Sequence, residues 1–227
     1  MNDLSKLASP GAADKLMELV LKAFGPSVEQ FGLIGGDLVG EIRWNNLRRI
    51  AARMQKKLEQ AERKPKTIPP RLLVPILQSA SVEDDDTLQE MWAGLLATAS
   101  QERDKLSPSF AETLKQLTPD EARYFDKLYR FRKENARNPN FPDRTISPLT
   151  FSEQAGTPRG VSAETFERLG LIGRDYGLTQ KENFDEMDVG YLFKMTDYAM
   201  KFMKACHADF HIEPRPEATQ KKAAKKG

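Results

Sequence analysis

The chain has 227 residues, of which 30% are charged, and its formal net charge at pH 7 is only +2. This balance excludes a global positive field that would draw the protein to nucleic acid or membrane, so any such attraction must come from a local patch. The single cysteine, Cys206, excludes an internal disulfide and suits a reducing compartment. Because no secretory signal and no apolar run of about 20 residues is apparent, we expect a cytoplasmic protein.

The first part of the chain predicts a flexible start followed by helices. Residues 1–12 have the composition of a loose end, and residues 13–24 carry apolar side chains at helical spacing. A longer helical pattern runs from Pro26 to about Glu62, and its apolar stripe shifts midway, which indicates a bend or a change of packing partner. Three glycines four residues apart favour close packing of another helix, with self-association and a lipid-facing role as alternatives. They are Gly32, Gly36 and Gly40.

The second half of that pattern separates an apolar stripe from a basic face. Residues 41–66 hold nine Lys/Arg against three Glu, while the stripe runs from Trp44 to Leu58. The basic face is most simply a solvated helix face, and the alternative is a surface for nucleic acid, lipid headgroups or an acidic protein. The candidate residues for binding such an anionic partner are Arg43, Arg48, Arg49, Arg53, Lys56 and Lys57.

The most regular pattern is a pair of apolar helices in residues 67–100, joined by an acidic turn. Asp86 precedes the first apolar residue of the second helix, and Gln89 follows three residues later, which predicts a capping box. The consecutive aspartates that begin at Asp84 could hold a divalent cation, but helix capping is the simpler interpretation. We predict that the structural core contains Trp44, Leu88, Met91, Trp92, Leu95 and Leu96.

The chain after residue 105 predicts a second domain, which follows a helical domain over residues 13–105. The order helix, helix, strand, polar hairpin, strand, helix over residues 106–212 is typical of a winged-helix-like module. Residues 213–227 lack apolar periodicity and predict a disordered basic tail. The expected elements are a helix from Ser107, a helix capped by Thr118 and Glu121, an irregular connection over 133–160, a helix over 162–170, strands near 169–178 and 190–196 with a hairpin tip at 179–188, and a last helix capped by Thr196.

A winged-helix module can bind DNA with one helix in the major groove and a wing beside it. Here the candidate recognition helix, residues 162–170, carries one basic residue, Arg168, against two glutamates, and the hairpin tip at 179–188 is mostly acidic. This charge balance is unfavourable for phosphate contacts. We therefore expect the module to serve as a protein-interaction or structural domain.

The sequence contains no recognisable catalytic constellation, so we expect a protein that is not an enzyme and needs no cofactor. A Walker-type loop and an HExxH motif are both missing, and the segment GLIGGDLVG (32–40) resembles a dinucleotide loop without a strand before it. Cys206, His207 and His211 form a partial zinc set without an evident fourth ligand, so a metal site is not expected. The overall expectation is a mainly α fold with a helical hairpin and a small β-hairpin.

Four segments together resemble the abortive-infection alpha (Abi-alpha) family, a bacterial domain of otherwise unknown function. They are GEIRWNNLRRI (40–50), IPPRLLVPILQSASVEDDDTLQEMWAGLLATA (68–99), LTPDEA (117–122) and ERLGLI (167–172). The resemblance covers roughly residues 15–210 and implies a role in phage defence, in which an infected cell stops growing before phage matures. It brings no established catalytic residues.

These expectations combine into a non-enzymatic defence factor that binds a phage or host protein. The alternative is a nucleic-acid-binding winged-helix regulator that uses the basic face. Peripheral membrane contact through residues 26–58 and homo-oligomer formation also stay open.

Overall fold

The computed structural model of the protein describes residues 38–102, 104, 106–134, 145–146, 157–158, 160–175 and 192–210. These residues are mainly α-helical, which confirms the predicted fold class, and they contain seven helices and a three-stranded antiparallel sheet. The predictions that lie outside the described residues concern the segments 1–12 and 13–24, the glycines Gly32 and Gly36, most of the connection over 133–160, the hairpin tip at 179–188, His211 and the tail at 213–227.

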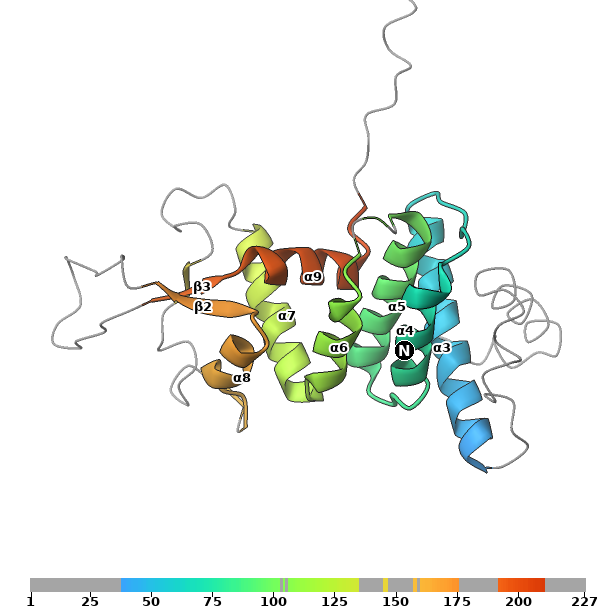
Figure 1. Ribbon diagram of the computed structural model, residues 1–227, viewed down its shortest axis with the longest axis horizontal. Coiled ribbons are helices and arrows are strands. Elements are labelled where there is room, and N and C mark those ends of the chain that lie inside the picture. Colours follow the sequence, from blue (N-terminus) through green and yellow to red (C-terminus); the bar gives the residue numbers. More distant parts are fainter. Residues whose placement is uncertain are drawn as a thin grey trace, which may run out of the picture.

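The described helices are arranged around α5, with the sheet at one end of the molecule. Figure 1 shows α3, α4 and α5 together at the other end, α6 and α7 between them and the sheet, and α9 running from the sheet toward α5. None of these helices is both long and apolar enough to cross a membrane. The elements are α3 (Leu38–Gln60), α4 (Pro70–Ala80), α5 (Asp86–Gln101), α6 (Ser109–Gln116), α7 (Pro119–Glu134), β1 (Thr145–Ile146), α8 (Ala163–Arg168), β2 (Ile172–Asp175), β3 (Leu192–Met195) and α9 (Asp197–His207).

α4 and α5 form the predicted helical hairpin. α4 begins at Pro70, because proline suits the first helical position, where an N–H group has no partner within the helix. α5 is capped by Asp85, whose carboxylate accepts hydrogen bonds from the backbone N–H groups of Thr87 and Leu88 at 2.9 and 3.1 Å. The predicted cap, Asp86, is therefore wrong by one residue.

The capping box predicted between Asp86 and Gln89 is also wrong. The side-chain amide of Gln89 is fully buried and donates to the Glu83 carbonyl at 2.8 Å. Asp86 binds Arg53 of α3. Any aspartate of a consecutive run can cap a helix, so the local sequence does not decide between them. In the structure Asp85 caps α5, and Asp86 instead binds Arg53 of α3, which is distant in sequence.

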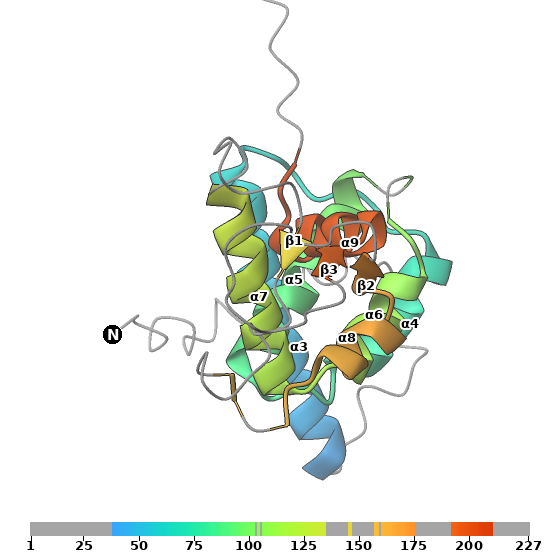
Figure 2. The ribbon, with the colours of Figure 1, turned by 90° about the vertical axis from the view of Figure 1, so that its left-hand side faces the viewer.

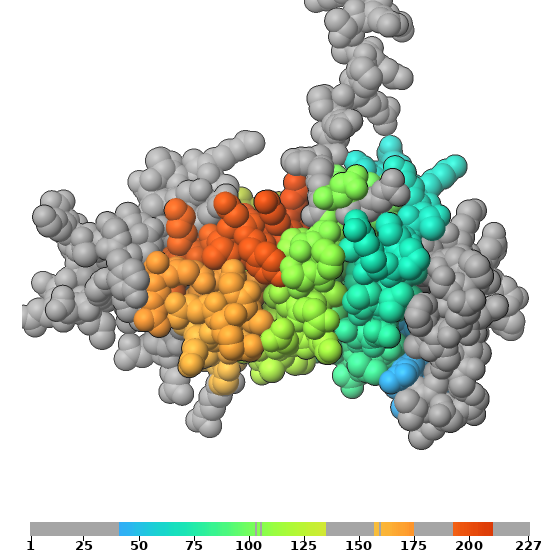
Figure 3. All heavy atoms as spheres, in the orientation of Figure 1, coloured from blue at the N-terminus to red at the C-terminus, as the bar shows by residue number. Residues whose placement is uncertain are grey.

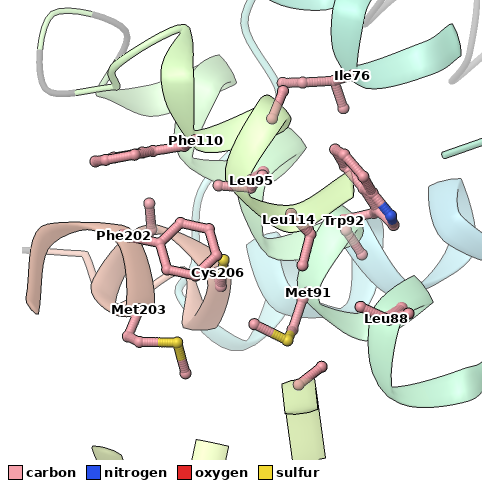
Figure 4. Close-up of a cluster of buried hydrophobic side chains, with 14 of the residues drawn as sticks. Ile76, Leu88, Met91, Trp92, Leu95, Phe110, Leu114, Phe202, Met203 and Cys206 are labelled. Atoms are coloured by element: carbon pink, nitrogen blue, oxygen red, sulfur yellow. The ribbon is translucent and has the colours of Figure 1, made fainter. Parts of the chain in front are cut away.

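α5 lies at the centre of the core, and every residue from Met91 to Ser100 is buried. Figure 4 shows that side chains of α4, α6 and α9 surround those of α5. The prediction for Trp44 differs from the structure, since this residue on α3 is only partly buried and packs against the core. The other predicted core residues are all buried: Leu88, Met91, Trp92, Leu95 and Leu96.

α5 and α9 approach each other unusually closely at Gly94. A Cβ atom at this position would lie 1.7 Å from the carbonyl oxygen of Cys206, so only glycine fits. One turn further along α5, the hydroxyl of Thr98 donates to the Ala205 carbonyl at 2.9 Å. These contacts join residues on either side of position 105, so one core is shared across the predicted domain boundary, and the division into domains stays a prediction.

Three predicted helix starts are confirmed by their caps. At the start of α7 the backbone N–H of Thr118 donates to Glu121 at 2.9 Å, and the N–H of Glu121 donates to the Thr118 hydroxyl at 3.3 Å. Ser162 caps α8 and Thr196 caps α9 through the same kind of hydrogen bond. Such caps use only neighbours in sequence, which is why the sequence predicts them well.

The sheet has the order β1-β3-β2, with both pairs of strands antiparallel. The paired strands β2 and β3 confirm the predicted strands, with Ile172 opposite Met195. The two-residue strand β1 was not predicted, because it falls within the expected irregular connection. Gly170 has a φ of +68°, a left-handed conformation that ends α8 as predicted. Figure 2 shows the sheet and α8 facing the viewer, beside α7.

Candidate functional site

Five of the six candidate cations of α3 divide into two groups, and the first group faces α5. The guanidinium of Arg53 binds the Asp86 carboxylate and donates to the Asp86 carbonyl at 2.8 Å, and it lies 3.6 Å from Glu90. The Lys57 ammonium lies 2.6 Å from the same Glu90 carboxylate. The two side chains are only 25% and 15% exposed. We call Arg53 and Lys57 the inward cations, because carboxylates of the same chain neutralise them.

The second group binds no carboxylate of the described residues. Arg49 and Lys56 are exposed and Arg48 is half-buried. Within the described residues, the side chains of all three make no ion pair and no hydrogen bond. We call Arg48, Arg49 and Lys56 the outward cations. Arg43 belongs to neither group, because it is partly buried and its Nε atom has no hydrogen-bond partner in the described part of the chain.

The acidic turn before α5 binds α3 and α7. The Asp85 carboxylate caps α5 and also lies 2.7 Å from Arg123 of α7, which binds Asp120 at 2.9 Å. Burial raises the pKa of Asp85, but hydrogen bonds from the helix N–H groups and from Arg123 outweigh it, so this pKa lies below its usual value. Burial raises the pKa of the neighbouring Glu83. Asp85 and Asp86 thus have structural roles as a cap and as ion-pair partners.

A polar cluster joins the C-terminal end of α9 to α7. The His207 Nε2 atom lies 2.6 Å from the Asp126 carboxylate, and the Tyr129 ring packs against the imidazole at 5.1 Å. The Tyr129 hydroxyl donates to Asp209 at 3.3 Å, and Lys133 binds the same carboxylate at 2.6 Å. These contacts link helices about 80 residues apart in sequence. The sequence does not predict this cluster, because no local motif connects its members.

Burial and charge shift the ionisation of this cluster. Burial raises the pKa of Asp126, but the hydrogen bonds from His207 and Arg130 lower it by more, so the pKa lies below its usual value. Burial and the nearby Asp209 carboxylate raise the pKa of Tyr129, which keeps its hydroxyl protonated as a donor.

The partial zinc set does not come together within the described residues. Cys206 is fully buried in the core, where burial raises the pKa of its thiol, whereas the adjacent His207 binds Asp126. His211 lies outside the described residues. Across the described segments no group of three metal-ligating side chains is assembled.

A pocket of about 380 Å³ lies between α6 and α9. Figure 3 shows these two helices side by side on one face of the molecule. The Tyr198 hydroxyl is within 2.6 Å of the Thr113 hydroxyl, and the Tyr198 ring packs edge-on against Phe110 at 5.3 Å. The residues that line the pocket come from two segments about 90 positions apart in sequence, so no local spacing pattern predicts the pocket. They are Asp104, Leu106, Ser107, Phe110, Tyr198 and Lys201.

Arg168 of the candidate recognition helix and Arg174 of the following strand β2 bind acceptors of the protein itself. Arg168 donates to the Gln116 side chain at 2.9 Å, and Arg174 binds the Glu167 carboxylate through two N–H groups at 2.8 and 2.9 Å. This arrangement leaves α8 without a described cation aimed at solvent.

Comparison with known protein families matches residues 43–206 to the family described as abortive infection alpha. The match spans well over half of the chain, so the protein belongs to this family, as the resemblance of its segments implied. Among curated proteins and among solved structures, no significant match is found.

Proposed function

We propose that the protein is a non-enzymatic abortive-infection factor that acts in phage defence, in the cytoplasm, by binding a phage or host macromolecule. Membership of the abortive infection alpha family over residues 43–206 carries this proposal. In abortive infection an infected cell stops growing before phage matures, so a factor of this kind must recognise some component of the infection.

The polar cluster between α7 and α9 contains the groups best suited to proton transfer, and their contacts support a binding protein rather than an enzyme. A general acid or base has to reach a proton of its substrate. Asp126 and His207 face each other at 2.6 Å, and Tyr129 packs on the imidazole and donates to Asp209. Each group is thus engaged in holding α9 to α7, and the cluster has a structural role in this proposal.

The test is the plating efficiency of a broad phage panel on cells that express the protein, compared with cells that carry an empty vector. We expect fewer plaques for at least one phage on the expressing cells. Equal plating for every phage would sink the proposed role in defence.

A second comparison separates binding from catalysis. The variant Asp126→Asn with His207→Gln removes the acid–base groups and keeps the volume of the cluster. We expect it to protect cells about as well as the unaltered protein, provided that its circular dichroism shows a folded chain. Complete loss of protection in a folded variant would instead indicate that the cluster performs chemistry.

The alternative proposal is a nucleic-acid-binding winged-helix regulator, and the order of the sheet favours it. β3 lies between β1 and β2, and α8 contacts β2, an arrangement compatible with the expected winged-helix-like module. Arg168 and Arg174 bind acceptors of the same chain, which argues against α8 as the recognition helix. Under this alternative the basic face binds the nucleic acid, so binding would fall steeply with salt and with charge reversal at Arg48, Arg49 and Arg53. Self-association is a further proposal, which the mass of the protein in solution tests.

A further inference from the structure

We infer that the outward face of α3 binds the phosphate backbone of nucleic acid through Arg48, Arg49 and Lys56. This inference rests on the proposed function, and it names the binding surface of the protein and the chemical class of the partner. The binding is electrostatic and does not read the base sequence, because phosphate contacts carry no sequence information directly.

Arg48 and Arg49 differ from most other arginines of the described residues in being unpaired, a property that they share with the exposed Arg71 at the start of α4. Arg48 and Arg49 make no ion pair or side-chain hydrogen bond there. Five arginines elsewhere each bind an acceptor of the same chain. They are Arg53, Arg123, Arg130, Arg168 and Arg174.

Further charged residues follow α3 in the chain, among them the exposed Glu62. Lys64 and Lys66 follow the helix, are exposed and make no ion pair within the described residues. Two carboxylates on the same helix reduce the charge only in part. Glu41 is exposed near the start of α3, and Glu59 is also exposed and accepts a hydrogen bond from Gln55 at 2.6 Å. A local positive field therefore exists although the net charge of the whole chain is small.

A polyanion fits this face better than a protein surface does. Stable protein interfaces centre on buried apolar and aromatic anchors, with charged residues depleted at their core. Between Arg48 and Lys56 no large apolar side chain is exposed, and the exposed apolar residue of α3, Ile42, lies about two turns before Arg49. The face thus offers charge without an apolar anchor, which suits a phosphate backbone.

A membrane surface fits less well, because α3 has no apolar face to insert. An amphipathic helix that lies on a membrane buries its apolar side among the lipids. The apolar side of α3, with Leu47, Ile50 and Met54, is already buried in the core that α3 shares with α5. Only electrostatic attraction to anionic headgroups would be left.

The length of the face suits several phosphate contacts. Residues 48 to 56 of a helix span about 12 Å, and a duplex presents roughly seven phosphate charges over that distance. The planar guanidinium groups of Arg48 and Arg49 can each bind a phosphate through two parallel hydrogen bonds. Lys56 adds a third positive charge about two turns from Arg49.

The test measures binding of the full chain to fluorescein-labelled duplex DNA and to single-stranded RNA by fluorescence anisotropy, between about 50 and 200 mM salt. For three phosphate contacts we expect the logarithm of the affinity for duplex DNA to fall with the logarithm of the salt concentration with a slope of about −3. Arg49→Glu with Lys56→Glu should weaken binding about tenfold or more and reduce the magnitude of the slope by about 2.

The matched control is Lys115→Glu with Lys127→Glu, which changes the net charge equally at two exposed lysines on α6 and α7. We expect this control to bind nearly as well as the unaltered protein. The variant Arg49→Gln with Lys56→Gln should reduce the slope as the reversal does, and it keeps the test valid if the reversal disturbs the helix. A slope near zero, or equal losses in the α3 variant and the control, would overturn the inference.

Anionic vesicles of phosphatidylserine and phosphatidylcholine distinguish a lipid partner. Stronger binding to these vesicles than to either nucleic acid would overturn the inference in favour of a membrane. Plating efficiency separates the two proposals. Protection by the unaltered protein without nucleic-acid binding would refute the inference alone, and nucleic-acid binding without protection against any phage would refute the proposed function alone.

Discussion

α3 and α9 flank the central helix α5 by different means. α3 buries an apolar stripe that includes Leu47, Ile50 and Leu58, and its ion pairs to α5 lie at the edge of that contact. α9 contacts α5 through a close backbone approach at Gly94, and a polar cluster fixes its far end to α7. The first contact is spread over many interchangeable side chains, whereas the second depends on a few particular positions. Single substitutions at these positions should therefore be more damaging than the loss of an ion pair at the edge of the α3 contact.

Removal of the largest buried side chain should have the largest effect on stability. Trp92 of α5 is 1% exposed, and its replacement by alanine leaves a cavity, so we expect Trp92→Ala to lower the free energy of unfolding by about 3–5 kcal/mol. Urea denaturation measures this value. The control is Trp92→Phe, which keeps most of the volume and removes a buried N–H without a partner within the described structure. Equal stability of Trp92→Ala and the unaltered protein would contradict the core described above.

The close approach of α5 and α9 predicts that even one methyl group at position 94 is harmful. Gly94→Ala places a Cβ atom 1.7 Å from a backbone oxygen of α9, which cannot move without shifting the helix. We expect a loss of about 3 kcal/mol, at the upper end of the usual cost of overpacking. The thermal melting midpoint of the variant measures it. Gly173→Ala is the control, since its Cβ atom would meet only ordinary contact at 4.0 Å.

The polar end of α9 predicts a dependence of stability on acid pH. The pKa of Asp126 is lower in the folded chain than its usual value near 3.9. Its contribution to stability is therefore present above about pH 4 and is lost as the pH falls through the lower, folded pKa. Asp126→Asn should cost about 1–3 kcal/mol at pH 7, and it should flatten the fall in stability below about pH 4.

The pKa of Asp85 is also lowered, so Asp85 adds to the loss of stability in acid. The variant Asp85→Asn is therefore the control, because it separates the contribution of Asp85 from that of Asp126. Urea denaturation between about pH 3 and pH 7 measures both variants. An acid profile of Asp126→Asn that coincides with the profile of the unaltered protein would show that this carboxylate does not hold α9.

The smallest effect should come from the edge of the α3–α5 contact. Lys57→Gln removes an ion pair with Glu90, whose side chain is 48% exposed, so we expect a loss of at most about 1 kcal/mol. Leu58→Ala, at the next position of the same helix, removes a side chain that is 1% exposed and should cost about 2–5 kcal/mol. The two costs are compared by urea denaturation. A larger cost for Lys57→Gln than for Leu58→Ala would contradict the statement that the apolar stripe, and not the ion pairs at its edge, holds α3 to α5.

The sequence predicts those parts of the fold that depend on neighbours along the chain. The caps at Thr118, Ser162 and Thr196 and the apolar stripe of α5 are local patterns, and all are present. The cap of α5 was misplaced by one residue, because each of three consecutive aspartates has the same local suitability. Tertiary ion pairs distinguish them: Asp85 binds Arg123 of α7, and Asp86 binds Arg53 of α3.

The division of the α3 cations required the tertiary structure, although one signal was present in the sequence. Arg53 and Lys57 lie four residues apart, as do Asp86 and Glu90, so one helical edge matches the other in spacing and charge. The pocket beside Tyr198 and the cluster around His207 had no such signal. Their members come together only when α9 folds back onto α6 and α7.

The most direct test of the proposed function is a one-step growth experiment at high multiplicity of infection. It measures the number of phage released per infected cell and the survival of those cells. We predict that cells with the protein release fewer phage than vector controls, while infected cells stop growing and do not survive better. An unchanged phage yield, or infected cells that survive and continue to divide, would contradict a role in abortive infection.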